Sequence, residues 1–197
     1  MMSKELVLTK AQDIVKHSIQ TRLWEDILPS KEFYLYSAPI FTLLAAALIM
    51  MLYAGFNKEP TKPNRFSFFF AVFSLLLTSF FSCFIKIKSV TAYIGSGFLA
   101  DSLTQSSFLV ISLGALFTFI CASSTEVGRR LLRPEMTALM FMATSGLMIM
   151  CSAGEFLSFF VGLELMSLSI YVIVGYQRQD LSALEAAVKY FILGGMS

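Results

Sequence analysis

The sequence predicts an all-α protein, a bundle of helices that cross a lipid bilayer several times. Of its 197 residues, 56% are apolar and only 14% are charged, whereas a soluble domain carries about 25% charged residues. The mean hydropathy is +0.72, and the apolar residues gather in long uncharged stretches rather than short alternating ones. Lipid is therefore the expected solvent for most of the chain.

The first 32 residues differ from the rest of the chain. They carry ten of the 28 charged residues, with both signs mixed. This stretch lacks the apolar core and small-residue cleavage site of a signal peptide, so we expect it to be retained. We predict a polar tail over residues 1–32, either a surface helix that ends at Pro29 or loose chain.

Five long apolar stretches follow the tail. Four of them are free of charge, and each can cross hydrocarbon about 30 Å thick at 1.5 Å per residue. The predicted spans are 33–57, 66–85, 102–125, 136–154 and 156–177, the last with one internal carboxylate. A sixth apolar pattern starts at residue 183 and covers about half a span. We therefore expect a transmembrane domain over residues 33–197, truncated in its sixth span, that forms the front part of a larger protein.

The basic residues of the loops predict an orientation, because short cytoplasmic loops are rich in Lys and Arg. Loops one, three and five together hold seven Lys or Arg, against two in loops two and four. These three loops are expected to face the cytoplasm or its equivalent, with the tail on the opposite side. The five Lys and Arg of the tail itself favour the opposite orientation, with the tail on the cytoplasmic side.

Glu164 is the most informative single residue, because it lies near the middle of the fifth span. A charged group at the centre of a membrane helix costs about 2.5 to 3.5 kcal/mol on insertion scales. A carboxyl group there avoids this cost by staying protonated, and a nearby lysine would favour its charged form. Glu164 is thus a candidate proton relay, or alternatively a neutral group that only bonds a neighbouring helix.

Lys189 enters the sixth span four residues after Glu185. This spacing allows an ordinary ion pair along one helix face, and the same lysine is a candidate relay partner for Glu164. Gly154, Ser158 and Gly162 recur every four residues, which favours close helix packing and would let another helix approach Glu164.

Several functions are excluded or left without support. A net charge of +2 without a Lys/Arg cluster does not suggest a nucleic-acid partner. The three cysteines, isolated in apolar stretches, are expected to fill the core rather than bind metal or form disulfides. The Gly95-Ser96-Gly97 turn is expected to be a flexible connector. No dinucleotide, iron–sulfur or haem motif occurs, so any redox cofactor is expected in another subunit.

The second half of the chain resembles the subunit N family of proton-pumping NADH:quinone oxidoreductases. The most specific segments are GLELMSLSIYV at 162–172 and ALEAAVKYFILGG at 183–195, and FLADSLTQSSFLVISLGALFTF at 98–119 is similar to the family's third span. The resemblance implies an antiporter-like fold. It also implies that Glu164 and Lys189 belong to a chain of buried ionisable groups that moves protons, while NADH, quinone, flavin and iron–sulfur centres lie in other subunits.

The predicted function is therefore proton translocation in a membrane-arm subunit, with other membrane subunits as partners. The expected location is a bacterial inner membrane, with an organellar membrane as the alternative. Two other functions stay open, a cation/proton antiporter subunit of the same fold and a purely structural subunit.

Overall fold

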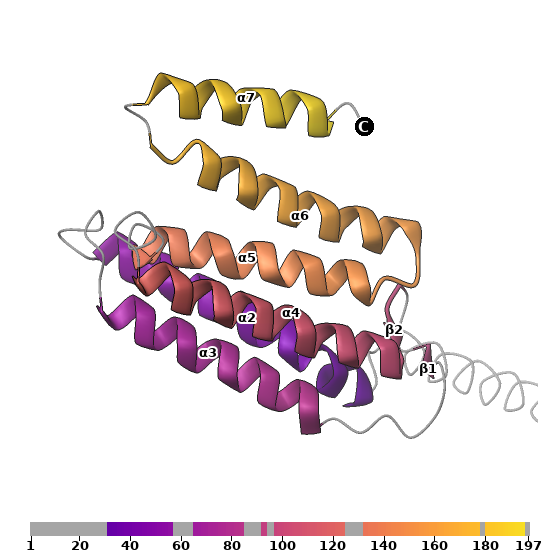
Figure 1. The fold of residues 1–197 in the computed structure, drawn as a ribbon. Helices are drawn as coiled ribbons and strands as arrows, with labels where there is room; N and C mark the ends of the chain where they lie inside the picture. Colours follow the sequence, from indigo (N-terminus) through magenta and orange to yellow (C-terminus); the bar gives the residue numbers. More distant parts are fainter. Residues whose placement is uncertain are drawn as a thin grey trace, which may run out of the picture.

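The computed structural model describes residues 31–56, 65–84, 92–93, 97–124, 132–177 and 180–195. Nearly all of the predicted tail lies outside these residues. The described helices are α2 (Lys31–Phe56), α3 (Arg65–Phe84), α4 (Ser102–Ser124), α5 (Pro134–Cys151), α6 (Phe156–Val174) and α7 (Leu181–Gly195). Five of them, α2 to α6, are long and apolar enough to cross a membrane. The helices run alongside one another (Figure 1), and the prediction of an all-α transmembrane bundle is confirmed.

The helix ends follow from local chemistry. The carboxylate of Asp101 accepts a hydrogen bond from the backbone N–H of Thr104 at 2.6 Å, which caps the first turn of α4. Asp180 accepts one from the N–H of Ser182 at 3.0 Å and caps α7 in the same way. Helix α5 starts with Pro134 in its first turn, where the missing N–H of proline has no helical partner to lose.

Helix α5 lies at the centre of the bundle. Of the apolar stretch of α5 that is long enough to cross a membrane, 67% is buried inside the protein, whereas in α6 the buried share is 11%. The core around α5 consists of large apolar side chains, and the rings of Phe119 on α4 and Phe141 on α5 lie 6.0 Å apart between centroids. Figure 1 shows α6 between α5 and α7, so that α6 and α7 form an outer layer on one side of the α2–α5 bundle.

Several hydroxyl groups inside the bundle are hydrogen-bonded, whereas the buried hydroxyl of Ser67 has no partner among the described residues. The Thr78 hydroxyl donates to the carbonyl of Ser74 at 2.8 Å, one turn back on the same helix. Hydroxyl pairs also join neighbouring helices, Thr42 with Thr78 at 3.1 Å and Ser79 with Ser112 at 2.8 Å. In a membrane such pairs satisfy polar groups that lipid cannot, so they fix the order of α2, α3 and α4.

A short hairpin precedes α4 at one end of the bundle. Strands β1 (Ala92–Tyr93) and β2 (Leu99–Ala100) pair antiparallel, and the N–H of Leu99 donates to the carbonyl of Ser152 at 2.7 Å. Gly97 has a φ of 98°, a conformation open mainly to glycine. Of the connector expected at Gly95-Ser96-Gly97, the first two residues lie outside the described part of the chain, and the carbonyl of Gly97 accepts a hydrogen bond from the Gly154 N–H. This partner is remote in sequence, so local composition did not indicate it.

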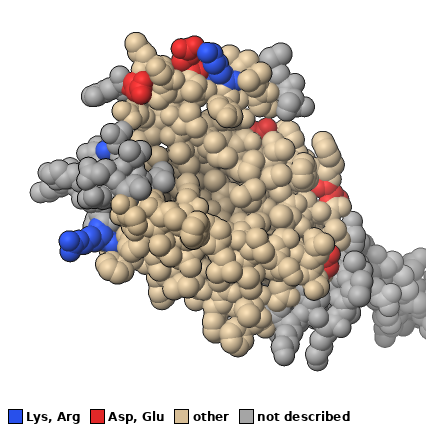
Figure 2. All heavy atoms as spheres, in the orientation of Figure 1, with Lys and Arg blue, Asp and Glu red and all other residues tan. Residues whose placement is uncertain are grey.

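The three cysteines do not fill the core as expected. Cys83, Cys121 and Cys151 are all exposed on the protein. The expectation failed because lipid is as apolar as a protein interior, so an apolar side chain in a membrane helix can point either way. The same reason accounts for the many exposed Phe and Leu side chains. On the face shown in Figure 2 the surface is largely uncharged, with the described charged residues at its edges.

Candidate functional site

Glu164 lies on the face of α6 that turns away from the bundle. On the opposite face, Gly162 packs against α5 and Ser169 is buried. Two residues along an α-helix rotate the side chain by about 200°, so Glu164 points away from the α5 contact. Tyr171 lies seven residues further along, two turns on the same face, and its ring contacts Phe191 of α7 at 5.9 Å between centroids. The Glu164 face of α6 is thus the face that α7 covers further along.

The carboxylate of Glu164 is partly exposed. Within the described part of the chain it makes no hydrogen bond and no ion pair. The described residues therefore leave the Glu164 carboxylate without a charged partner.

Lys189 lies on the far side of α7. The α7 residues that contact α6 include Ala187, which packs on Gly175, and Phe191, which packs on Tyr171. Lys189 falls between them in sequence and therefore on the other face of the helix. Its ammonium group is 2.5 Å from the carboxylate of Glu185, and the two side chains are 67% and 66% exposed. Figure 2 shows acidic and basic atoms side by side at this edge of the molecule.

The structure does not bring Glu164 and Lys189 together. Helices α6 and α7 are antiparallel (Figure 1), and the Gly175–Ala187 and Tyr171–Phe191 contacts place Lys189 level with about residue 173 of α6. Glu164 lies about nine residues away from that level, or ~14 Å along the helix axis. The described residues of α7 also end before they reach the level of Glu164. A direct exchange between these two side chains is not possible in this arrangement.

The predicted small-residue stripe performs two separate packing tasks. A side chain at Gly162 would come within 2.8 Å of the backbone nitrogen of Met150, and one at Gly146 within 2.8 Å of the carbonyl oxygen of Gly162. These glycines let α5 and α6 approach closely. Gly154 precedes α6 and contacts the hairpin instead. Among the described residues, the close helix contact at Gly162 lies on the face of α6 opposite Glu164, so this stripe does not bring another helix to the carboxylate.

A charged cluster that the sequence did not indicate joins α5 to the end of α6. The Tyr176 hydroxyl donates to the Glu135 carboxylate at 2.7 Å, and the Arg133 guanidinium lies 5.5 Å from the Tyr176 ring centroid. Burial and the Glu135 carboxylate raise the pKa of Tyr176, while Arg133 acts in the opposite direction. Glu135 and Tyr176 are 41 residues apart, and no spacing pattern links them.

Comparison with known families assigns the C-terminal part of the chain. Residues 153–197 match a family described as NADH:quinone oxidoreductase/Mrp antiporter, transmembrane. The matched region includes α6 and α7, and with them Glu164 and Lys189.

Individual relatives match much more of the chain. It is 40% identical over 159 residues to NADH-quinone oxidoreductase subunit N 1 of Thermodesulfovibrio yellowstonii, covering 81% of this chain and 33% of the relative. It is 32% identical over 161 residues to subunit N of Nitrosomonas europaea, covering 80% and 32%. With subunit N of Parvibaculum lavamentivorans it is 30% identical over 176 residues, covering 88% and 35%. The chain thus spans about a third of the length of these relatives.

These relatives are bacterial, and the five candidate spans agree with a multi-pass topology. The predicted location in a bacterial inner membrane is therefore confirmed. Together with the family match over α6 and α7, the relatives show that the chain is similar over about four fifths of its length to NADH-quinone oxidoreductase subunit N.

Proposed function

We propose that this chain takes part in proton translocation as part of a membrane-arm subunit of an NADH:quinone oxidoreductase. The observation that carries the proposal is the similarity to subunit N over 81% of the chain. NADH, quinone, flavin and iron–sulfur centres would belong to other subunits, and this chain would contribute no redox centre. Its partners would be the other membrane subunits of the complex and the lipid around them.

Glu164 would be the group that takes up and releases the proton. Three features support this role: its place in the middle of α6, its partial exposure on the α7-facing side, and its lack of an ionic partner among the described residues. Ionisable groups inside membrane spans are costly and mark ion pathways. Lys189 would act separately, since its ammonium group already pairs with Glu185. Lys189 would act on the side of α7 that faces away from α6.

The experiment is NADH-driven proton uptake in membrane vesicles that carry the full-length protein with Glu164→Gln. We expect the uptake rate to fall about tenfold or more, with the abundance of the complex unchanged, because glutamine cannot exchange a proton. The matched control is Glu155→Gln, an exposed carboxylate next to the first turn of the same helix. Unchanged uptake in Glu164→Gln would refute the proposed role.

Two other functions make different predictions in the same vesicles. A purely structural role predicts that Glu164→Gln lowers the abundance of the complex rather than its pumping. An antiporter role is favoured by the description of the matched family, which also names Mrp antiporters. It predicts exchange of Na⁺ or K⁺ for protons in the absence of NADH.

A further inference from the structure

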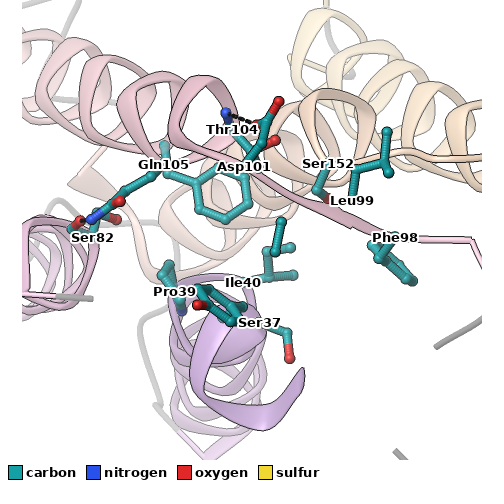
Figure 3. Close-up of a pocket in the computed structure, with 13 residues that line it drawn as sticks. Ser37, Pro39, Ile40, Ser82, Phe98, Leu99, Asp101, Thr104, Gln105 and Ser152 are labelled. Carbon is teal, nitrogen blue, oxygen red and sulfur yellow. Dashed lines mark hydrogen bonds between the residues drawn. The ribbon is translucent and has the colours of Figure 1, made fainter. Parts of the chain in front are cut away.

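Several polar side chains of the α2–α5 bundle are bonded to the protein itself. At the hairpin end they line a small pocket with a cavity volume of about 40 Å³, which is room for a few water molecules. There the side-chain nitrogen of Gln105 donates to the carbonyl of Ser82 at 2.6 Å. Figure 3 shows the Asp101 carboxylate turned toward the backbone N–H of Thr104. These groups hold the helices and their ends in place.

The outer face of α6 carries polar side chains without such bonds. Ser167 lies three residues after Glu164, and Tyr171 lies seven residues after it. At about 100° per residue, the three side chains fall within about 60° of one another around the helix, on the face turned away from α5. All three are partly buried, and within the described part of the chain none of them makes a hydrogen bond. Inside a membrane such groups are costly unless water satisfies them.

The hydroxyl of Tyr171 lies closer to Glu164 than its position in the sequence indicates. A side chain added at Gly194 of α7 would overlap this hydroxyl. The antiparallel contacts of α6 and α7 place Gly194 level with about residue 168 of α6. The hydroxyl is therefore about four residues from the level of Glu164, or ~6 Å along the helix axis, and Ser167 lies between the two. One or two water molecules beside Ser167 can bridge this gap.

Helix α7 holds the Tyr171 side chain in place. The ring contacts Phe191 at 5.9 Å between centroids, and its hydroxyl end lies against Gly194. The next residue, Gly195, does not serve this purpose, because a Cβ there would meet nothing within 4 Å. A hydroxyl fixed at one point can pass a proton along a defined path.

We propose that Tyr171 is a proton relay for Glu164, with the Ser167 hydroxyl and water between them. This inference rests on the proposed role of Glu164 in proton translocation. A proton that leaves the Glu164 carboxyl passes to a water molecule beside Ser167 and then to the Tyr171 oxygen, which releases its own proton toward α7. Each hydroxyl ends with the number of protons it began with, and no group is oxidised or reduced.

The test is NADH-driven proton uptake in membrane vesicles that carry the full-length protein with Tyr171→Phe. We expect the uptake rate to fall about fivefold at unchanged abundance of the complex, because the ring and its contact with Phe191 remain while the exchangeable proton is lost. The matched control is Tyr190→Phe, which removes the hydroxyl of an exposed tyrosine on α7 and should leave the uptake rate unchanged.

Two further variants test the path and the position of the hydroxyl. Ser167→Ala should lower the uptake rate about threefold, whereas Ser169→Ala should not, because the Ser169 hydroxyl is buried on the opposite face and donates to the Leu165 carbonyl at 2.7 Å. Gly194→Ala should lower the rate as Tyr171→Phe does, because the added methyl group displaces the hydroxyl. Gly195→Ala is its control.

A double variant separates a relay from a merely structural role. Two groups in series on one path should not have additive effects, so Glu164→Gln with Tyr171→Phe should pump no more slowly than Glu164→Gln alone. A loss equal to the product of the two single losses would overturn the proposal. So would normal uptake in Tyr171→Phe while Glu164→Gln pumps slowly, and normal uptake in Ser167→Ala would exclude Ser167 from the path. Normal uptake in Glu164→Gln would instead refute the proposed function itself.

Discussion

The two parts of this molecule, helices α2 to α5 and helices α6 and α7, differ in how many of their side chains are buried. Helices α2 to α5 share a core of fully buried side chains, including Leu43, Leu75 and Phe141. Helix α6 buries only Gly162 and Ser169, and α7 buries no residue. The two predicted relay residues, Glu164 and Lys189, both lie in this sparse outer layer. The bundle is therefore a scaffold, and the ionisable groups lie where further protein surface can reach them.

This difference has a physical origin. Membrane helices associate through close packing and polar contacts rather than through exclusion of water. Helix α5 is close to its neighbours on several sides, whereas α6 packs tightly on the bundle at Gly146 and Gly162 and on α7 where Tyr171 meets Gly194. The remaining faces of α6 carry Phe, Leu and Val side chains that lipid accommodates without penalty.

Replacing a phenylalanine by alanine should destabilise the protein much more in the α2–α5 bundle than in the outer layer of α6 and α7. This is the largest difference that we expect between the two regions. Phe141→Ala leaves a cavity in the core, and we expect it to reduce the free energy of unfolding by about 3 to 5 kcal/mol. Phe160→Ala, on an exposed face of α6 with 47% of the residue exposed, should reduce it by less than about 1 kcal/mol. Unfolding by SDS titration from detergent micelles measures both. Equal losses would show that α6 is packed as firmly as the bundle.

The contact between the two regions is tested at its closest point. A leucine at Gly162 would clash with the α5 backbone, where the added Cβ alone is 2.9 Å from the carbonyl oxygen of Gly146. We expect Gly162→Leu to reduce the unfolding free energy by about 1 to 3 kcal/mol. Gly114→Leu is the control, because a Cβ at Gly114 meets nothing within 4 Å. If both variants are equally stable, α5 and α6 do not depend on this contact.

The polar link between the two regions should contribute less. Tyr176→Phe removes the hydrogen bond to Glu135 but keeps the ring beside Arg133. We expect a loss of about 1 kcal/mol, measured in the same titration. Tyr190→Phe, on the exposed surface of α7, should have no measurable effect. A similar loss in the two variants would mean that the Glu135 bond does not stabilise the protein.

An effect of similar size, which depends on pH, is expected at the cap of α4, within the scaffold itself. The hydrogen bonds from Thr104 hold the pKa of Asp101 below its ordinary value of 3.8. A carboxylate with a lowered pKa stabilises the folded state above that value and stops doing so as the pH falls through the lowered pKa. Asp101→Ala should therefore reduce the unfolding free energy by about 1 kcal/mol at pH 7. The difference from the wild type should shrink at pH 3, and a constant difference would contradict this origin.

The candidate site shows which inferences depend on tertiary structure. The position of Glu164 in a span follows from the sequence, because a single carboxylate in an uncharged stretch is visible there. The direction in which its side chain points does not follow from the sequence. The faces of a membrane helix have similar polarity, so the hydropathy along the chain shows only a weak helical period. The separation of Glu164 from Lys189 depends on the antiparallel register of α6 and α7. That register is decided by Tyr171, Gly175 and their partners.

By itself the sequence determined the fold class, the approximate span positions and the family, because length and hydropathy are properties of local stretches and the motifs are continuous segments. Only the tertiary structure decided that α5 is central, that the cysteines face outward, and that Tyr176 bonds Glu135. It also decided that α2, α3, α4, strand β2 and the turn after α5 line a small apolar pocket beside Asp101. These features join residues far apart in the chain, and in lipid an apolar residue gives no sign of whether protein or membrane will cover it.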